Sequence, residues 1–334
     1  MTAGETLLAV LVRATAVLLG GGLVGAAIGP GDARVRHRLW AATLGGALVA
    51  GAGGWLASLA GWHWDGGTIL RTPAIPAHRP VATLLVLAWA VGMAVLVGRA
   101  LRGLSTARRL AMAACPPTDA SWEATLAEAA HALGEARPPR LLVSSFVSVP
   151  LTVGMLRPSI VLPSGCDGWA LRRRRAVLLH EMAHVQRRDC AMELFVQLVC
   201  AVYWLHPGAW WVARRLRLAR EQACDAAVLR TGTPAIEYAE HLVALLRNAA
   251  SVAAVGVALG RLAAFEARLV ALTHGTRPQA WRPARRLAAF APLGLAILLG
   301  LWSPLGRAAP ARDGTAHHAK AACACIKKHH RTVN

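Results

Sequence analysis

One short segment of the sequence combines two imidazoles and a carboxylate at a spacing that suits metal-assisted hydrolysis. The segment is His180-Glu181-Met182-Ala183-His184, set in an apolar run. Residues four apart lie on one face of a helix, so His180 and His184 can direct ring nitrogens at a single ion. Glu181 lies one step round the helix, where it can take a proton from an activated water and pass it to a leaving amine. The pattern predicts a zinc site with Glu181 as the general base.

A polar helical turn is the alternative explanation of these five residues. In a chain with 13 His, a chance match is expected in on the order of one or two such chains per hundred. The surrounding residues are apolar, however, and three ionisable groups in such a helix would be costly to bury without a metal ion. The context therefore favours the zinc site.

A second acidic segment supplies the candidate for the third metal ligand. Glu221 lies 37 residues after His184, and Asp225 follows four residues later on the same helical face. One carboxylate can bind zinc while the other accepts the ring N–H of a ligand histidine. We assign Glu221 to the metal and Asp225 to the histidine. An exposed acidic pair on a basic helix would give the same spacing, but the upstream motif favours the metal site. Cys224 could also be a ligand, but it faces another side of this helix from Glu221, so we expect it to be a small buried residue.

The composition of the chain indicates that the helices and strands that position these residues belong to a membrane protein. Of 334 residues, 55% are hydrophobic and only 16% are charged, which is too little charge to cover a water-soluble surface. Four stretches approach the length of about 20 apolar residues that a bilayer requires. They run over Leu7–Ile28, Leu39–Ala60, Val81–Leu101 and Leu287–Leu305. Arg13, within the first stretch, is expected to snorkel to the surface or to face the helix bundle.

Lys and Arg (37) outnumber Asp and Glu (17), which gives a net charge of +20, and the positions of the basic residues indicate an orientation. Arginines crowd the loop after the first span and follow the third span, whereas the loop over 62–80 holds only two. Because positive residues collect on the cytoplasmic side, we expect the N-terminus outside and the segment from about 102 to 286 in the cytoplasm. No DNA-reading motif accompanies the charge, so direct nucleic-acid binding is not expected.

The expected fold is a membrane α-helical bundle of about four helices with an inserted α+β domain. Three membrane helices occupy residues 1–101, the zinc peptidase domain 102–286, a fourth membrane helix 287–305, and a short extracytoplasmic tail, expected to be disordered, 306–334. Hydrophobic periodicity and proline positions also predict the elements of the domain. These are helix Ser121–Leu133, strand Leu141–Val149, strand Ser159–Leu162, a helix from Leu171 that carries the motif, a half-buried membrane helix over Ala191–Leu205 and a helix from Pro207.

Two groups of residues have no assigned role. Tyr238 and His241, on a predicted helix, could reach the site as oxyanion stabilisers, but packing explains them equally well. A cluster of His and Cys in the tail could bind a metal or form a redox pair, although a disordered tail is favoured. The cluster comprises His317, His318, Cys323, Cys325, His329 and His330.

Four segments together resemble the BlaR/MecR family of membrane peptidases, which includes β-lactam-sensing signal transducers and relatives without a sensor. They are Val149–Pro163, Leu178–Asp189 (LLHEMAHVQRRD), Tyr203–Trp211 (YWLHPGAWW) and Glu221–Leu229 (EQACDAAVL). The resemblance extends over about residues 1–305. It is far more specific than the five-residue motif alone.

The resemblance implies a gluzincin-like fold, with His180, His184 and Glu221 on zinc and Glu181 as the base. It also implies a multi-pass protein of the bacterial cytoplasmic membrane, whose protein substrate is typically a winged-helix transcriptional repressor. Relatives cut themselves before the last span, and Arg285-Arg286 is the candidate site here, although a dibasic pair there equally serves as a membrane anchor. Only about thirty residues follow the last predicted span, so we do not expect β-lactam acylation.

Two other functions compete with regulatory cleavage of a repressor. A general quality-control metalloprotease of the membrane would use the same residues on many substrates. A non-catalytic signalling scaffold would not need the complete set of ligands and base, so it is disfavoured. The activating signal, the substrate and the oligomeric state are left open by the sequence.

Overall fold

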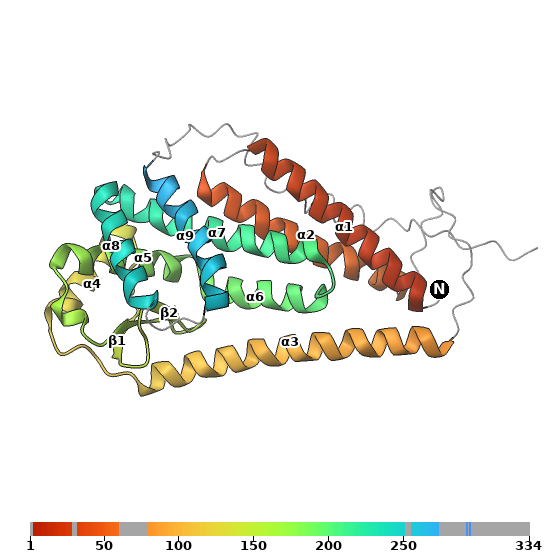
Figure 1. Cartoon of the computed structure of the whole chain (residues 1–334), viewed down its shortest axis with the longest axis horizontal. Coiled ribbons are helices and arrows are strands. Elements are labelled where there is room, and N and C mark those ends of the chain that lie inside the picture. Colours follow the sequence, from red (N-terminus) through yellow and green to blue (C-terminus); the bar gives the residue numbers. More distant parts are fainter. Residues whose placement is uncertain are drawn as a thin grey trace, which may run out of the picture.

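The computed structural model describes residues 3–28, 32–59, 79–250 and 255–273, together with Pro292 and Gly294. Long helices gather at one end and a smaller α+β unit lies at the other (Figure 1). The N-terminal helices are α1 (Ala3–Ile28), α2 (Ala33–Leu59) and α3 (Arg79–Ala113). Each of these covers one of the first three predicted spans.

Two of the three helices meet a simple test for a membrane span. The segments Val10–Ile28 in α1 and Thr83–Ala113 in α3 are long and apolar enough to cross a bilayer. Within the residues that the structure describes, α2 yields no such segment; its first turns carry Arg and His. The second span therefore stays a prediction. The fourth, Leu287–Leu305, lies outside the described residues apart from Pro292 and Gly294.

Helices α1 and α2 form a tight pair because small residues line their contact. A side chain at Gly21 would overlap Thr43, and one at Gly25 would overlap Trp40. The pair packs on α6 (Asp189–Val202) and α7 (Pro207–Arg230), and the four helices share one apolar core. Arg13 is only 6% exposed, so it faces the bundle, which was one of its two predicted positions.

Helix α3 runs apart from the α1–α2 pair along the other side of α6 (Figure 1). Two indoles fasten it, since Trp89 donates to Val202 O (3.0 Å) and Trp204 donates to Trp89 O (3.2 Å). Most of its apolar side chains are exposed, as expected for a helix surrounded by lipid. The helix continues well past the predicted end of the span at Leu101 and reaches the sheet of the α+β unit.

The α+β unit is built on a three-stranded sheet in the order β1-β3-β2. Strand β1 (Arg140–Ser144) is parallel to β3 (Ser159–Pro163), and β2 (Leu151–Val153) is antiparallel to β3 at the other edge. The prediction of β3 is confirmed to within one residue. The predicted strand Leu141–Val149 is wrong beyond Ser144, because the Ser144 hydroxyl accepts a hydrogen bond from Phe146 N–H and the chain turns there. Strand β2 was not predicted.

Helices cover the sheet and enclose a second apolar core. Helix α4 (Ser121–Leu133) has its predicted bounds, and α5 (Leu171–Gln186) begins where predicted. Helices α8 (Ala235–Ala250) and α9 (Val255–Thr273) pack against α5 and α7 respectively and against each other. A short 3-10 turn, η1 (Cys166–Gly168), precedes α5.

Helix α7 joins the two halves of the molecule. It begins at Pro207 as predicted, with the His206 ring accepting a hydrogen bond from Gly208 N–H (3.1 Å). Its first half lies in the core shared with α1 and α2, whereas Val228 near its end lies in the core of the α+β unit. The predicted helix Ala191–Leu205 corresponds to α6, which begins two residues earlier and ends three residues earlier.

The close contact of α1 with α2 gives a stability prediction. Ala at position 21 would overlap Thr43, whereas Ala at position 22 would meet only Trp211 at 3.8 Å. Both substitutions gain the same helix propensity, so Gly21→Ala should be less stable than Gly22→Ala by about 1–3 kcal/mol, the usual cost of overpacking. Denaturation of both variants in detergent measures the difference. Equal stability would show that the two helices are not packed this closely.

Candidate active site

The chemistry predicted from the sequence is centred on α5, which is buried between the sheet, α7 and α8. His180 is 9% exposed and Glu181 is 7% exposed. After α5 the chain reverses at Arg188, a non-glycine residue with φ of 56°. This turn brings Asp189, the first residue of α6, next to His184 of α5. A left-handed conformation of this kind costs about 1–2 kcal/mol, so the surrounding contacts must hold it.

The two histidines and Glu221 converge on one point. His180 Nε2 lies 3.3 Å from His184 Nε2. The Glu221 carboxylate approaches from α7, with Oε2 at 3.6 Å from His180 Nε2 and Oε1 at 3.9 Å from His184 Nε2. Ligands about 2.0–2.1 Å from a tetrahedral zinc ion would be roughly 3.3–3.4 Å apart. The spacing of the three side chains therefore fits a metal ion between them.

The hydrogen bonds behind the rings explain why the Nε2 atoms act as acceptors. His184 Nδ1–H donates to Asp189 Oδ2 (2.6 Å). His180 Nδ1–H donates to the Tyr238 hydroxyl (2.8 Å), which in turn donates to Asp225 Oδ1 (2.8 Å). Both Nε2 lone pairs then face each other and a carboxylate, and such a cluster of acceptors needs a cation.

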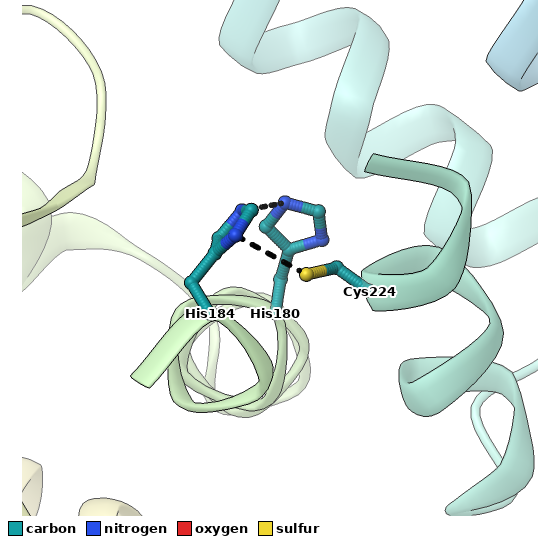
Figure 2. Close-up of side chains that lie close together, drawn as sticks. All are labelled: His180, His184 and Cys224. Carbon is teal, nitrogen blue, oxygen red and sulfur yellow. Dashed lines mark hydrogen bonds between the residues drawn. The ribbon is translucent and has the colours of Figure 1, made fainter. Parts of the chain in front are cut away.

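Cys224 lies close to both histidines and forms with them a second candidate set of metal ligands. Its Sγ is within 4.8 Å of both rings, and Figure 2 shows it approaching the His184 ring from α7. The nearest ring atom is His184 Nδ1, at 3.3 Å, which already donates to Asp189. Burial also raises the pKa of the Cys224 thiol well above its usual value. Cys224 is therefore the buried residue that the sequence predicted.

An arginine from α9 holds the two carboxylates of α7. Arg268 donates from Nε to Asp225 Oδ2 (2.9 Å) and from Nη2 to Asp225 Oδ1 (2.7 Å), and its Nη1 lies 3.4 Å from Glu221 Oε2. Burial alone would raise the pKa of Asp225, but Arg268 outweighs it and lowers that pKa to about 2. The two histidines and Arg268 likewise lower the pKa of Glu221 well below its usual value, against the effect of burial. Both groups are held as carboxylates.

The proposed base, Glu181, contacts the edge strand β2. Thr152 in β2 donates from its hydroxyl to Glu181 Oε2 (2.8 Å). A cavity of about 550 Å³ opens over this side of the site and contacts α3, α8 and α9 as well as β2. His180, Glu181, His184 and Glu221 all line it. The cavity gives the four residues access to a bound chain.

The residues whose roles the sequence left open differ in where they lie: Tyr238 and His241 are near the site, and the others are outside the described residues. Tyr238 is 2% exposed and spends its hydroxyl on His180 and Asp225, which makes it part of the support behind the ligands. His241 lines the cavity, and its Nε2 is buried without a hydrogen-bond partner among the described residues. Arg285, Arg286 and the His/Cys cluster of the tail lie outside the described residues.

Three supporting residues were missed by the sequence analysis. Asp189 could have been suspected, since it is an acidic residue five positions after His184. Thr152 and Arg268 gave no signal, because a threonine in a short strand and one arginine among many carry no local pattern. They are identified only by their contacts with Glu181 and Asp225.

A buried cluster of acceptors beside an open cavity is the arrangement of a metallohydrolase. The sequence model of the family described as BlaR1 peptidase M56 matches residues 71–272, more than half of the chain. The chain therefore belongs to this family of metallopeptidases, which implies a metal cofactor. It is also similar to the Regulatory protein BlaR1 of Bacillus licheniformis, with 35% identity over 88 residues, or 26% of this chain and 15% of that relative. The chain thus spans a small part of that relative's length.

The two candidate third ligands can be separated by substitution. Glu221→Ala removes a carboxylate that faces both Nε2 atoms and should abolish stoichiometric metal binding. Cys224→Ala removes a neutral thiol whose nearest ring atom is His184 Nδ1 and should leave metal content unchanged. Metal analysis of the purified variants, with Cys190→Ala as a control for loss of another cysteine, gives the answer. Loss of metal in Cys224→Ala but not in Glu221→Ala would reverse the assignment.

Proposed function

We propose that this chain is a membrane-embedded zinc endopeptidase of the HExxH…ExxxD type. The observation that carries the proposal is the cluster of His180 Nε2, His184 Nε2 and the Glu221 carboxylate, at separations of 3.3–3.9 Å and next to an open cavity. Two imidazoles and one carboxylate with a free fourth position are the ligand set of catalytic rather than structural zinc. Bound zinc would polarise the scissile carbonyl and make water more acidic.

The protein side chains supply the proton transfer and hold the reacting groups in position. Glu181 accepts the proton of the attacking water and passes it to the leaving amine. Thr152 holds that carboxylate from β2 and so fixes the direction from which it acts. Asp189 and the Tyr238–Asp225 pair orient the two histidines, as supporting hydrogen bonds of metal ligands do.

His241 is our candidate for stabilising the oxyanion that develops on the substrate carbonyl. It lies in the same cavity as Glu181, and its Nε2 makes no hydrogen bond within the described residues, the Glu237 carboxylate being 3.7 Å away. A donor that is preorganised in this way is typically worth about 10²–10³ in kcat.

For the substrate we favour a cytoplasmic regulatory protein, a transcriptional repressor of the winged-helix type. Support comes from the segments shared with the BlaR/MecR family and from a relative that is named a regulatory protein. Quality control of many membrane proteins is the second candidate, since the cavity borders α3 and could admit a chain from the membrane side. A scaffold without activity is disfavoured by the complete ligand set and the base.

We further propose that the peptidase unit faces the cytoplasm of a bacterium and that the N-terminus lies outside. The end of α1 and the end of α3 lie towards the α+β unit (Figure 1). Both ends are followed or accompanied by arginines, such as Arg34, Arg38, Arg108 and Arg109. The positive-inside rule assigns that side to the cytoplasm.

Glu181→Gln tests the mechanism directly. The amide keeps the size of the side chain and can still accept from Thr152, so zinc content should be unchanged. It cannot accept the proton, so cleavage should fall by at least about 10²–10⁴-fold. The measurement is cleavage of a purified candidate repressor by the full chain in detergent, beside zinc analysis. Unchanged cleavage with zinc still bound would refute the mechanism.

His241→Gln tests the oxyanion role. We expect kcat to fall by about 10²–10³ while KM and zinc content change little, because the contact forms only as the carbonyl becomes an oxyanion. His131→Gln is the matched control, since His131 is an exposed histidine of α4 that does not line the cavity. A similar small effect in both variants would assign His241 to packing.

A further inference from the structure

A second cavity, of about 560 Å³, lies against a different face of α5 and is strongly basic. The start of α2 and parts of α5, α6 and α7 form its walls. Arg34, His37, Arg38, Arg187 and Arg230 line it, and no Asp or Glu does. We call it the basic cavity. It is separate from the catalytic cavity and contains none of the proposed ligands.

Two buried nitrogen atoms of the basic cavity have no acceptor. Arg187 donates from Nη2 to Asp189 and to Arg220 O, but its Nη1 is buried without a partner. His37 Nε2 is likewise buried without a partner among the described residues. Leaving a buried donor unsatisfied costs about 1–3 kcal/mol, and more for a charged group. Arg187 Nη1, which is always a charged donor, therefore points to an acceptor that binds from outside the chain.

The charges around the cavity repel one another. Burial lowers the pKa of Arg230, the nearby Arg34 and Arg187 lower it further, and Asp32 only partly opposes them. Burial and Arg187 together lower the pKa of His37 to about 4, so its ring is neutral at pH 7. An anion in the basic cavity would relieve this repulsion and accept the unsatisfied hydrogen bonds.

The position of the cavity bears on where such an anion comes from. Arg34 and Arg38 follow the apolar segment Val10–Ile28 by no more than ten residues. Side chains this close to the end of a span lie at the level of the lipid headgroups on whichever side they face. Arginine guanidinium groups bind phosphate through paired, charge-assisted hydrogen bonds.

We propose that the basic cavity is a binding site for a phosphate group, supplied by the headgroup of an anionic phospholipid or by a free phosphate. A phosphate there accepts from Arg187 Nη1 and fixes a side chain that also holds Asp189, the partner of His184. Occupancy of the cavity thereby supports the geometry of the metal site. The binding itself does not depend on the peptidase function proposed above.

The test compares two double substitutions that remove the same charge. Arg34→Gln/Arg38→Gln changes the basic cavity, whereas Arg108→Gln/Arg109→Gln changes exposed arginines of α3 outside it. The full chain in neutral detergent is titrated with phosphatidylglycerol, with phosphatidylcholine and with inorganic phosphate. Bound lipid is counted by native mass spectrometry, and thermal stability is followed in parallel.

We expect the cavity variant to bind its anion at least about tenfold more weakly than wild type, as the loss of charge-assisted hydrogen bonds predicts. The α3 variant should bind within about twofold of wild type. Preference for phosphatidylglycerol over inorganic phosphate identifies the lipid as the source, and the reverse identifies a free phosphate. Equal anion binding by both double variants would overturn the proposal. Arg230→Gln, on the opposite wall, gives a second test if the double variant is unstable.

Discussion

The central constraint on this structure is that several ionisable groups are buried together between α5 and α7. Two imidazoles and three carboxylates lose most of their contact with water, and each must be compensated. The compensation comes from three neighbouring helices: Asp189 from α6 faces His184, Tyr238 from α8 bridges His180 to Asp225, and Arg268 from α9 neutralises the α7 carboxylates. The face of α5 that carries the two histidines is thus packed against side chains that compensate the buried charges.

The same constraint explains why the metal ligands lie where the two halves of the molecule meet. Helix α7 contributes its first half to the core of the long helices and its second half to the peptidase core, with Glu221 and Asp225 in between. Any movement of α7 relative to α5 would change the distances between Glu221 and the histidines. Since α1 and α2 pack on α7, the position of α7 depends on contacts with both halves of the molecule.

Outside the site, arginines lie near the ends of the long helices. The arginines near the ends of α1 and α3 gather on the side of the α+β unit (Figure 1), where a membrane protein can place them at headgroup level. Some are gathered in a cavity without any acidic residue in its lining, and through Arg187 this cavity connects with Asp189 and so with His184. Part of the positive charge of the chain thus lies in a cavity that contacts the surroundings of His184.

The sequence alone determined the parts of the molecule that depend on local spacing. The i, i+4 pairs His180–His184 and Glu221–Asp225, the helices α4, α5 and α7, and the first apolar helices all follow from periodicity or from residues next to each other in the chain. The resemblance of four segments identified the family that the comparison later established. Only the tertiary structure could show that Thr152 donates to Glu181, that Arg268 donates to Asp225, and that Tyr238 bridges His180 and Asp225. Those contacts join residues from 13 to 58 positions apart, and no local pattern encodes them, because what brings such residues together is the burial of whole helices and strands against one another.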